Sequence, residues 1–183
     1  VGGALGAGIT ASGVDFASLQ GDKAVVEIMQ RMGADISKNA DSVTVNSGAT
    51  QATIIDASDC PDIIPVLTVL AAVSEGTTKI INAGRLRIKE CDRLAAITSE
   101  LNKMGAAITE EPEGLTITGK PEGLHGGVEA DAWNDHRIAM SLAIAAQCCA
   151  EPIILTGAGS VSKSYPDFWQ DYKSVGGKIE VLA

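Results

Sequence analysis

The segment AAITSELNKMGAAI, residues 95–108, combines an amphipathic helix pattern with a glycine stop. Its apolar residues, together with the leucine just before it, recur at helical spacing, so one face of a helix is expected to pack on a core. These core-facing residues are Leu94, Ile97, Leu101 and Met104. Gly105 then stands where helices commonly end in a left-handed turn, a conformation that glycine adopts without strain. The segment therefore predicts a surface helix that stops at Gly105 and leads into a strand.

The same ending occurs twice more in the chain. VVEIMQRMGADI (25–36) and DFWQDYKSVGGKI (167–179) share it, and their final isoleucines lie 72 and 71 residues from Ile108. Gly33 and Gly176 take the place of Gly105, and each ending is expected to lead into strand, as the alternating patterns SVTVNS (42–47) and GLTITG (114–119) show most clearly. The chain is therefore predicted to be built from three repeats.

A second element recurs with the same period. DIIPVLTVLAAVSEGTTKIINAG (62–84) resembles HRIAMSLAIAAQCCAEPIILTGAG (136–159), and the opening VGGALGAGITASGVDF (1–16) resembles their ends. Helices that are apolar on every side are expected to be buried. These patterns predict an α/β (α+β) fold of three βαβαββ units, with buried parallel helices and outer sheets. We expect one globular domain over 1–183, with units at roughly 1–56, 57–130 and 131–183.

The glycines of GGALGAG (2–8) also fit part of a dinucleotide-binding fingerprint. No strand precedes them, and no acidic residue follows in a βαβ context. Close helix packing through small residues is the favoured interpretation.

Composition limits the classes of function. The chain is 45% apolar and 20% charged with a net charge of −9, which is typical of a folded protein and disfavours nucleic-acid or membrane-surface binding. No signal peptide or apolar span is evident, so a cytoplasmic location is expected. Cys60, Cys91, Cys148 and Cys149 form no C-x-x-C pair, and we expect no metal at them.

Charged residues gather where helices are predicted to begin. Helix N-termini carry unpaired N–H groups that favour anions, so cations added there predict small anion sites. The residues concerned are Asp62, Lys89, Glu90, Arg93, His136, Arg137 and Lys163. If the buried helices are parallel, these sites converge on one face.

Simpler interpretations exist for most of these residues. Asp62, Asp92 and Asp135 fit N-caps, and Glu90 with Arg93 fits a surface ion pair. His136 fits a capping or solvated residue, and Asp22 is taken as a cap. Arg85 and Arg87 are left open between a substrate contact and a structural ion pair.

Four motifs identify a family. LRIKECDRL (86–94) resembles the signature of the 5-enolpyruvylshikimate-3-phosphate synthases, the enolpyruvyl transferases of the shikimate pathway. DCPDIIP (59–65), NDHRIAM (134–140) and SKSYPDF (162–168) match further motifs in the same order. The resemblance covers nearly the whole chain and implies the C-terminal domain of a two-domain enzyme. The resemblance further implies that an N-terminal domain, the expected partner of this chain, would supply the other half of the active site.

The resemblance also implies a role for each site residue. Asp62 would bind shikimate-3-phosphate and help deprotonate its 5-hydroxyl, and Lys89 would contact the phosphate or the attacking oxygen of the same substrate. Asp62, Lys89, Glu90 and His136 are the expected catalytic residues. Glu90 would carry the proton exchanged with the methylene carbon of phosphoenolpyruvate. Arg93 and Arg137 would hold the carboxylate of phosphoenolpyruvate and Lys163 its phosphate, with His136 beside them.

The chemistry agrees with these roles. Adding an alcohol to an enol phosphate needs a base on the hydroxyl and an acid on carbon, and eliminating phosphate reverses both transfers. No metal or organic cofactor is expected, and the full-length enzyme is expected to be a monomer. The isolated chain is expected to be inactive. The alternatives are a UDP-N-acetylglucosamine enolpyruvyl transferase and a non-catalytic repeat module that only binds.

Overall fold

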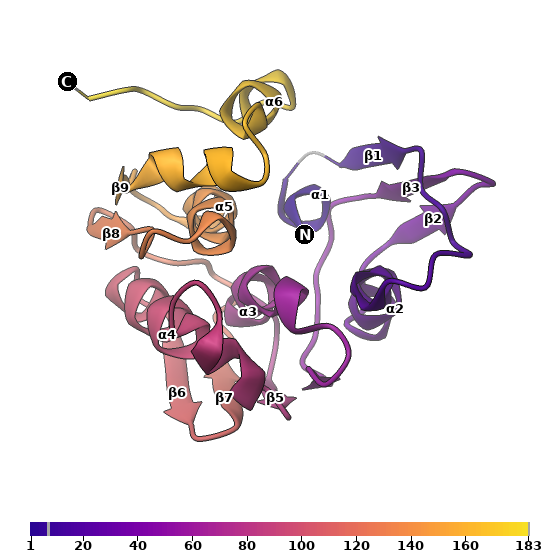
Figure 1. Cartoon of the computed structure of the whole chain (residues 1–183), viewed down its shortest axis with the longest axis horizontal. Coiled ribbons are helices and arrows are strands. Elements are labelled where there is room, and N and C mark those ends of the chain that lie inside the picture. Colours follow the sequence, from indigo (N-terminus) through magenta and orange to yellow (C-terminus); the bar gives the residue numbers. More distant parts are fainter. Residues whose placement is uncertain (7, 183) are drawn as a thin grey trace.

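The computed structural model describes residues 1–6 and 8–182. Its helices and strands fall into three consecutive groups, each with its own sheet. Figure 1 shows α3 and α5 in the middle of the molecule, with the three groups arranged around them. The mixed α/β arrangement predicted from the repeats is confirmed.

The middle group is a complete βαβαββ unit. Its sheet has the strand order β4-β5-β7-β6, with β4 and β5 parallel and the other pairs antiparallel. The elements are β4 (Ile54–Asp56), α3 (Ile64–Ala72), β5 (Thr77–Ile81), α4 (Arg93–Lys103), β6 (Ala107–Glu111) and β7 (Gly114–Thr118).

The first group lacks only the opening strand of such a unit. Its sheet order β1-β3-β2 matches β5-β7-β6 of the middle group, and both of its strand pairs are antiparallel. The elements are α1 (Gly2–Leu5), β1 (Ile9–Ser12), α2 (Ala24–Arg31), β2 (Ile36–Lys38) and β3 (Ser42–Val45). The predicted likeness between the opening of the chain and the other repeats is therefore present in the structure.

The third group departs from the prediction. It contains β8 (Glu129–Asp131), α5 (His136–Ala145), β9 (Ile154–Thr156) and α6 (Phe168–Ser174), and β8 pairs with β9 in parallel. The strand expected after Gly176 does not form, because 177–182 have no assigned strand. In the other groups this strand pairs with a final hairpin strand, β3 or β7, and the described part of the third group contains no equivalent. An extended segment without a pairing partner gains no ladder of hydrogen bonds.

The unit boundaries also differ from the prediction. β4 pairs with β5 and β8 pairs with β9, so each of these strands belongs to the unit that follows it. Both strands therefore join their units a few residues before the predicted starts at 57 and 131. The single domain over 1–183 stays a prediction, and Ala183 lies outside the described residues.

The core predictions are confirmed in detail. Leu94, Ile97, Leu101 and Met104 are each 0% exposed, and all but one of the nine residues of α3 are buried. Gly33, Gly105 and Gly176 have φ values of 83°, 99° and 99°, the left-handed conformation expected at helix ends.

The glycines at the start of the chain permit close packing. A Cβ atom on Gly2 would lie 3.2 Å from Cδ1 of Ile144 on α5, and one on Gly3 would lie 2.9 Å from the carbonyl oxygen of Val45. Helix packing through small residues therefore explains Gly2 and Gly3, while Ala7 in the same stretch lies outside the described residues.

Candidate functional site

The N-terminal ends of α3, α4 and α5 bring the predicted charges together. Asp92 caps α4 by accepting a hydrogen bond from the Ala95 N–H at 3.1 Å, and Asp135 caps α5 through the Arg137 N–H at 2.8 Å. Asp62 stands in the short turn Pro61–Ile63 before α3, where its side chain makes no cap. The cap interpretation therefore holds for Asp92 and Asp135 and is wrong for Asp62.

Asp62 instead receives three cations. Its carboxylate lies 3.2 Å from Lys89 Nζ, 2.9 Å from Arg93 Nη1 and 3.2 Å from Arg137 Nη2. Arg137 also donates to the Asp62 carbonyl oxygen at 3.0 Å. Burial alone raises the pKa of this carboxyl, but the three cations outweigh it and hold the pKa below its usual value. Asp62 is therefore ionised at neutral pH and faces the cations predicted to bind ligand.

Arg93 forms the buried centre of the cluster. Its side chain is 1% exposed, and it donates to Asp135 Oδ2 at 2.8 Å, Asp62 Oδ1 at 2.9 Å and Glu90 Oε2 at 2.6 Å. The surface ion pair considered for Glu90 and Arg93 is thus one edge of a buried network, with Asp135 0% exposed. In this structure the guanidinium is held by three carboxylates, so a ligand carboxylate would have to compete with them.

His136 is neither a cap nor solvated. It begins α5 with 9% exposure, and its Nδ1 atom is buried with no hydrogen-bond partner among the described residues. Because buried polar atoms are usually satisfied, an unpaired ring nitrogen beside Arg137 is a feature to be explained by the site's chemistry.

Lys163 joins the same segment from the third group. It lies at the end of the turn Ala158–Lys163 and donates to the carbonyl oxygen of Asn134 and, at 2.8 Å, to its side-chain Oδ1. Asn134 directly precedes Asp135, so Lys163 adds a further cation to the start of α5.

Sequence reasoning missed two contacts. The prediction that Asp22 is a cap is wrong, because no side-chain cap bond forms there, and its carboxylate lies 3.9 Å from Arg137 Nη2. Asp135 is the predicted cap and also pairs with Arg93 at 2.8 Å, a contact that the sequence does not indicate. No local pattern indicates either contact, because each joins segments far apart in the chain.

Arg87 proves to be structural. Its guanidinium donates to Asp92 at 2.9 Å, to Glu110 at 2.7 Å and to the carbonyl oxygens of Glu111 and Pro112 at 2.7 and 3.0 Å. It thereby ties the β6–β7 hairpin to the cap of α4. Arg85 is exposed on the turn Gly84–Ile88.

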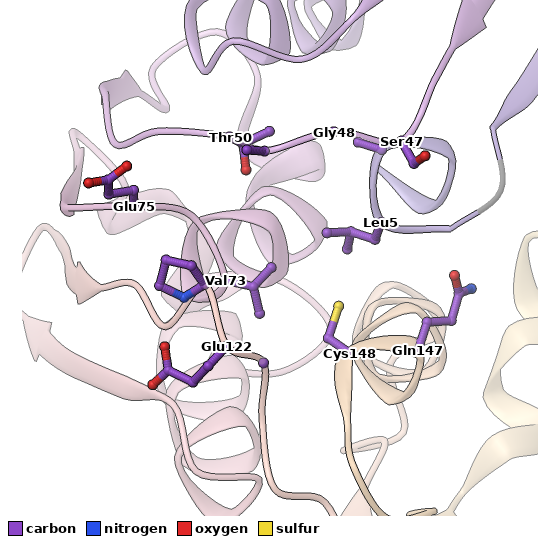
Figure 2. A pocket seen from close by; sticks show the side chains of 13 residues that line it. Leu5, Ser47, Gly48, Thr50, Val73, Glu75, Glu122, Gln147 and Cys148 are labelled. Atoms are coloured by element: carbon purple, nitrogen blue, oxygen red, sulfur yellow. The ribbon is translucent and has the colours of Figure 1, made fainter.

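A cavity of about 480 Å³ lies at the C-terminal ends of α3 and α5, opposite the ends that carry the charged cluster (Figure 2). Val73 follows α3, and Gln147 and Cys148 follow α5, so these lining residues are separated from the charged cluster by the length of each helix. At 1.5 Å per residue, helices of nine and ten residues span about 14–15 Å. This cavity is therefore distinct from the cluster.

The cluster suits acid–base work on anions. It offers the partly exposed carboxylates of Asp62 and Glu90 beside the cations Lys89 and Arg137. Cys91 is a poor nucleophile, because burial and the neighbouring Asp135 raise the pKa of its thiol to about 12. The described residues include no group of three or more His, Cys, Asp or Glu arranged to hold a metal. None of the described helices has the length and apolar character needed to cross a membrane.

Acidification is expected to destabilise the chain through Asp62 and Asp135. Burial raises the pKa of both carboxyls, but their cationic partners outweigh it and leave both below the usual value. A carboxyl with a lowered folded-state pKa stabilises the fold above its unfolded pKa of about 3.9, and this contribution is lost as the pH falls through the folded value. We expect the urea concentration at the midpoint of unfolding to be constant between about pH 7 and pH 5, and to decrease once the pH is lower than about 4. A midpoint that rises on acidification would contradict the ion-pair assignment.

Comparison with known proteins gives the family. The sequence model of the family EPSP synthase (3-phosphoshikimate 1-carboxyvinyltransferase) matches residues 2–172 of the chain. The 3-phosphoshikimate 1-carboxyvinyltransferases of Clostridium kluyveri and Clostridium beijerinckii are 54% and 57% identical over 97% of this chain. The chain spans only 41% of the length of each relative.

Solved structures agree. An EPSP synthase from Acinetobacter baumannii superposes with a TM-score of 0.89 at 29% identity, covering 100% of this chain and 45% of that one. An enolpyruvyl transferase from Streptomyces tendae shares the fold with a TM-score of 0.78 at 24% identity, covering 98% of this chain and 41% of that one. The resemblance carried by the four sequence motifs is thus confirmed: the chain belongs to the EPSP synthase family.

Proposed function

We propose that this chain is part of a longer enzyme that transfers the enolpyruvyl group of phosphoenolpyruvate to the 5-hydroxyl of shikimate-3-phosphate and releases phosphate. One observation carries the proposal: Asp62 and Glu90 are held by the same buried guanidinium, Arg93, at the cationic N-termini of the central helices. Both substrates are anionic, and the reaction needs two proton transfers. The cluster supplies groups for both needs.

The carboxylates are assigned to the proton transfers. In the proposed addition step, the Asp62 carboxylate takes the proton of the 5-hydroxyl as its oxygen attacks the enol carbon, while Glu90, acting in its carboxylic acid form, gives its proton to the methylene carbon and becomes a carboxylate. Elimination then reverses both transfers: Glu90 recovers a proton from the methyl group, and the departing phosphate carries away the other proton. The exposed parts of both side chains, 31% for Asp62 and 43% for Glu90, leave room for substrate contact.

The cations are assigned to the substrate anions. Arg137 and Arg93 are proposed for the carboxylate of phosphoenolpyruvate, because a guanidinium fork matches a carboxylate, and Lys163 for its phosphate. Lys89 is placed on shikimate-3-phosphate, and His136 lies beside Arg137 in the same helix turn. Lys89, Arg93 and Arg137 each face a carboxylate in this structure, so ligand binding at them exchanges one anion for another. Lys163 instead faces neutral oxygens of Asn134.

This exchange has a consequence for Asp62. While Lys89, Arg93 and Arg137 face it, the pKa of its carboxyl is held low, which makes it a weak base. Ligand anions that draw these cations away would raise the pKa of Asp62 and strengthen it as a base at the moment the substrates are bound.

The remainder of the longer protein is the proposed partner. The chain spans 41% of its relatives, and the cluster described here lies open on one side of Asp62, Lys89 and Arg137, which are 27–31% exposed. A second domain placed over this face would complete the anion site and exclude water. We also propose a cytoplasmic location, which suits the four free thiols in the described part of the chain.

A phosphate-release assay tests the function. The full-length protein with phosphoenolpyruvate is expected to release phosphate when shikimate-3-phosphate is added and to release none with UDP-N-acetylglucosamine. The 183-residue chain alone is expected to be silent with either acceptor. Turnover with the nucleotide sugar would overturn the substrate assignment, and turnover by the chain alone would overturn the need for the second domain.

A further inference from the structure

The start of α5 is reached through a strained turn. Trp133 and Asn134 have φ values of 51° and 52°, and the turn is closed by the Asp135 N–H, which donates to the Ala132 carbonyl oxygen at 2.9 Å. Asparagine tolerates the left-handed conformation, but for a bulky residue such as tryptophan it is an outlier. Such conformations persist only when the surroundings over-determine them, and they cluster at functional sites.

Glu100 supplies one constraint. It lies on α4 two turns after Arg93, and its side chain is 1% exposed. One oxygen accepts from the indole Nε1 of Trp133 at 3.0 Å, and the other accepts from the Asp131 N–H at 3.0 Å and from Lys103 Nζ at 2.7 Å. The Glu100 carboxylate is therefore hydrogen-bonded both to the end of β8 and to the tryptophan of the turn.

Other contacts fix the remainder of the turn. Asp131 Oδ1 accepts from the Trp133 backbone N–H at 2.6 Å, and Lys163, at the end of the turn Ala158–Lys163 in the same group, donates to Asn134. The residue that follows, Asp135, pairs with Arg93. The same helix, α4, thus holds this segment at two places, through Glu100 before the turn and through Arg93 after it.

We propose that Glu100 is a positioning residue: by holding Trp133 in its left-handed conformation, it sets the placement of Asp135, His136 and Arg137 at the start of α5. Glu100 itself does not touch substrate. An effect of Glu100 on enzyme activity rests on the function proposed above, whereas its effect on the conformation of residues 133–137 does not.

The substitution Glu100→Gln tests the proposal. Glutamine has nearly the same shape, but only one of its two terminal atoms can accept, so it cannot serve both Trp133 and the Asp131 N–H. In the 183-residue chain we expect the backbone amide resonances of residues 133–137 to shift. In the full-length protein we expect kcat/KM to fall about tenfold or more at a temperature where the variant is fully folded.

Lys103→Met is the matched control. It removes Lys103, the third hydrogen-bond partner of Glu100, whose side chain is 45% exposed, and it leaves the contacts of Glu100 to Trp133 and Asp131 in place. Amide resonances at 133–137 and kcat/KM are expected to stay at wild-type values. An equal effect of both substitutions would show that Glu100 contributes only general stability and would overturn the proposal.

A second variant tests the proposal in case Glu100→Gln does not fold. Trp133→Phe removes the indole donor and keeps the ion pair and the Asp131 contact of Glu100, so it should shift the amides of 135–137 in the same way. Wild-type resonances at 135–137 in this variant, or in folded Glu100→Gln, would overturn the proposal. If the full-length wild-type protein lacks transferase activity, the proposed function fails, whereas the amide shifts still decide the role of Glu100.

Discussion

Replacing Glu90 with glutamine or Asp62 with asparagine in the full-length protein is expected to lower kcat by about 10²- to 10⁴-fold, the usual contribution of a positioned acid or base. Neither amide can exchange a proton with the methylene carbon or with the attacking hydroxyl. Both substitutions keep the shape of the side chain and an oxygen that can accept from Arg93, so KM is expected to change less than kcat. Steady-state phosphate release measures both constants.

Glu75→Gln provides the matched control. Glu75 is an exposed carboxylate on the cavity at the far ends of α3 and α5, away from the cluster (Figure 2). Its kcat should equal that of the wild type. Full activity in Glu90→Gln and Asp62→Asn would favour the non-catalytic binding module and reject the assignment of these carboxylates.

The substitution Asp135→Asn is expected to destabilise the chain by about 3 kcal/mol or more, the usual cost of removing one partner of a buried ion pair. Asp135 is 0% exposed and pairs with Arg93 at 2.8 Å, so the variant leaves a buried guanidinium short of one counter-charge. Asparagine still caps helices well, which confines the loss to the ion pair. Urea unfolding of wild type and variant at neutral pH measures the difference.

Two further variants isolate the pair. Asp41→Asn changes an exposed aspartate and should alter the free energy of unfolding by no more than about 0.5 kcal/mol. Adding Arg93→Met to Asp135→Asn removes the buried guanidinium that has lost one of its three counter-charges, and should recover part of the stability. If Asp135→Asn is as stable as Asp41→Asn, the buried pair does not exist as described.

The sequence predicted the helices of this fold well because burial leaves a periodic trace. The stripe from Leu94 to Met104 and the stop at Gly105 depend on neighbours within a few turns, and both are found as expected. The missing strand after Gly176 shows the limit of such local reasoning, since a strand also needs a partner elsewhere in the chain.

The sequence indicated which charged residues would gather in the cluster, but not which of them contact one another. Charge at helix starts indicated Asp62, Glu90 and Arg137, and the resemblance to the family implied a role for each. That Arg93 would be almost fully buried among three carboxylates could not be predicted, because arginine is usually exposed and its partners come from three separate segments. Glu100 carried no signal at all, since in sequence it is an ordinary helix residue.

The central claim is that anionic substrates bind at the N-termini of α3, α4 and α5. A chemical-shift titration of the 183-residue chain with shikimate-3-phosphate, alone and with phosphoenolpyruvate, tests it most directly. We expect shifts concentrated at residues 62, 89–93, 136–137 and 163, with none around the distal cavity at Val73 and Cys148. Shifts that gather at the distal cavity, or that leave the cluster unchanged at saturating ligand, would contradict it.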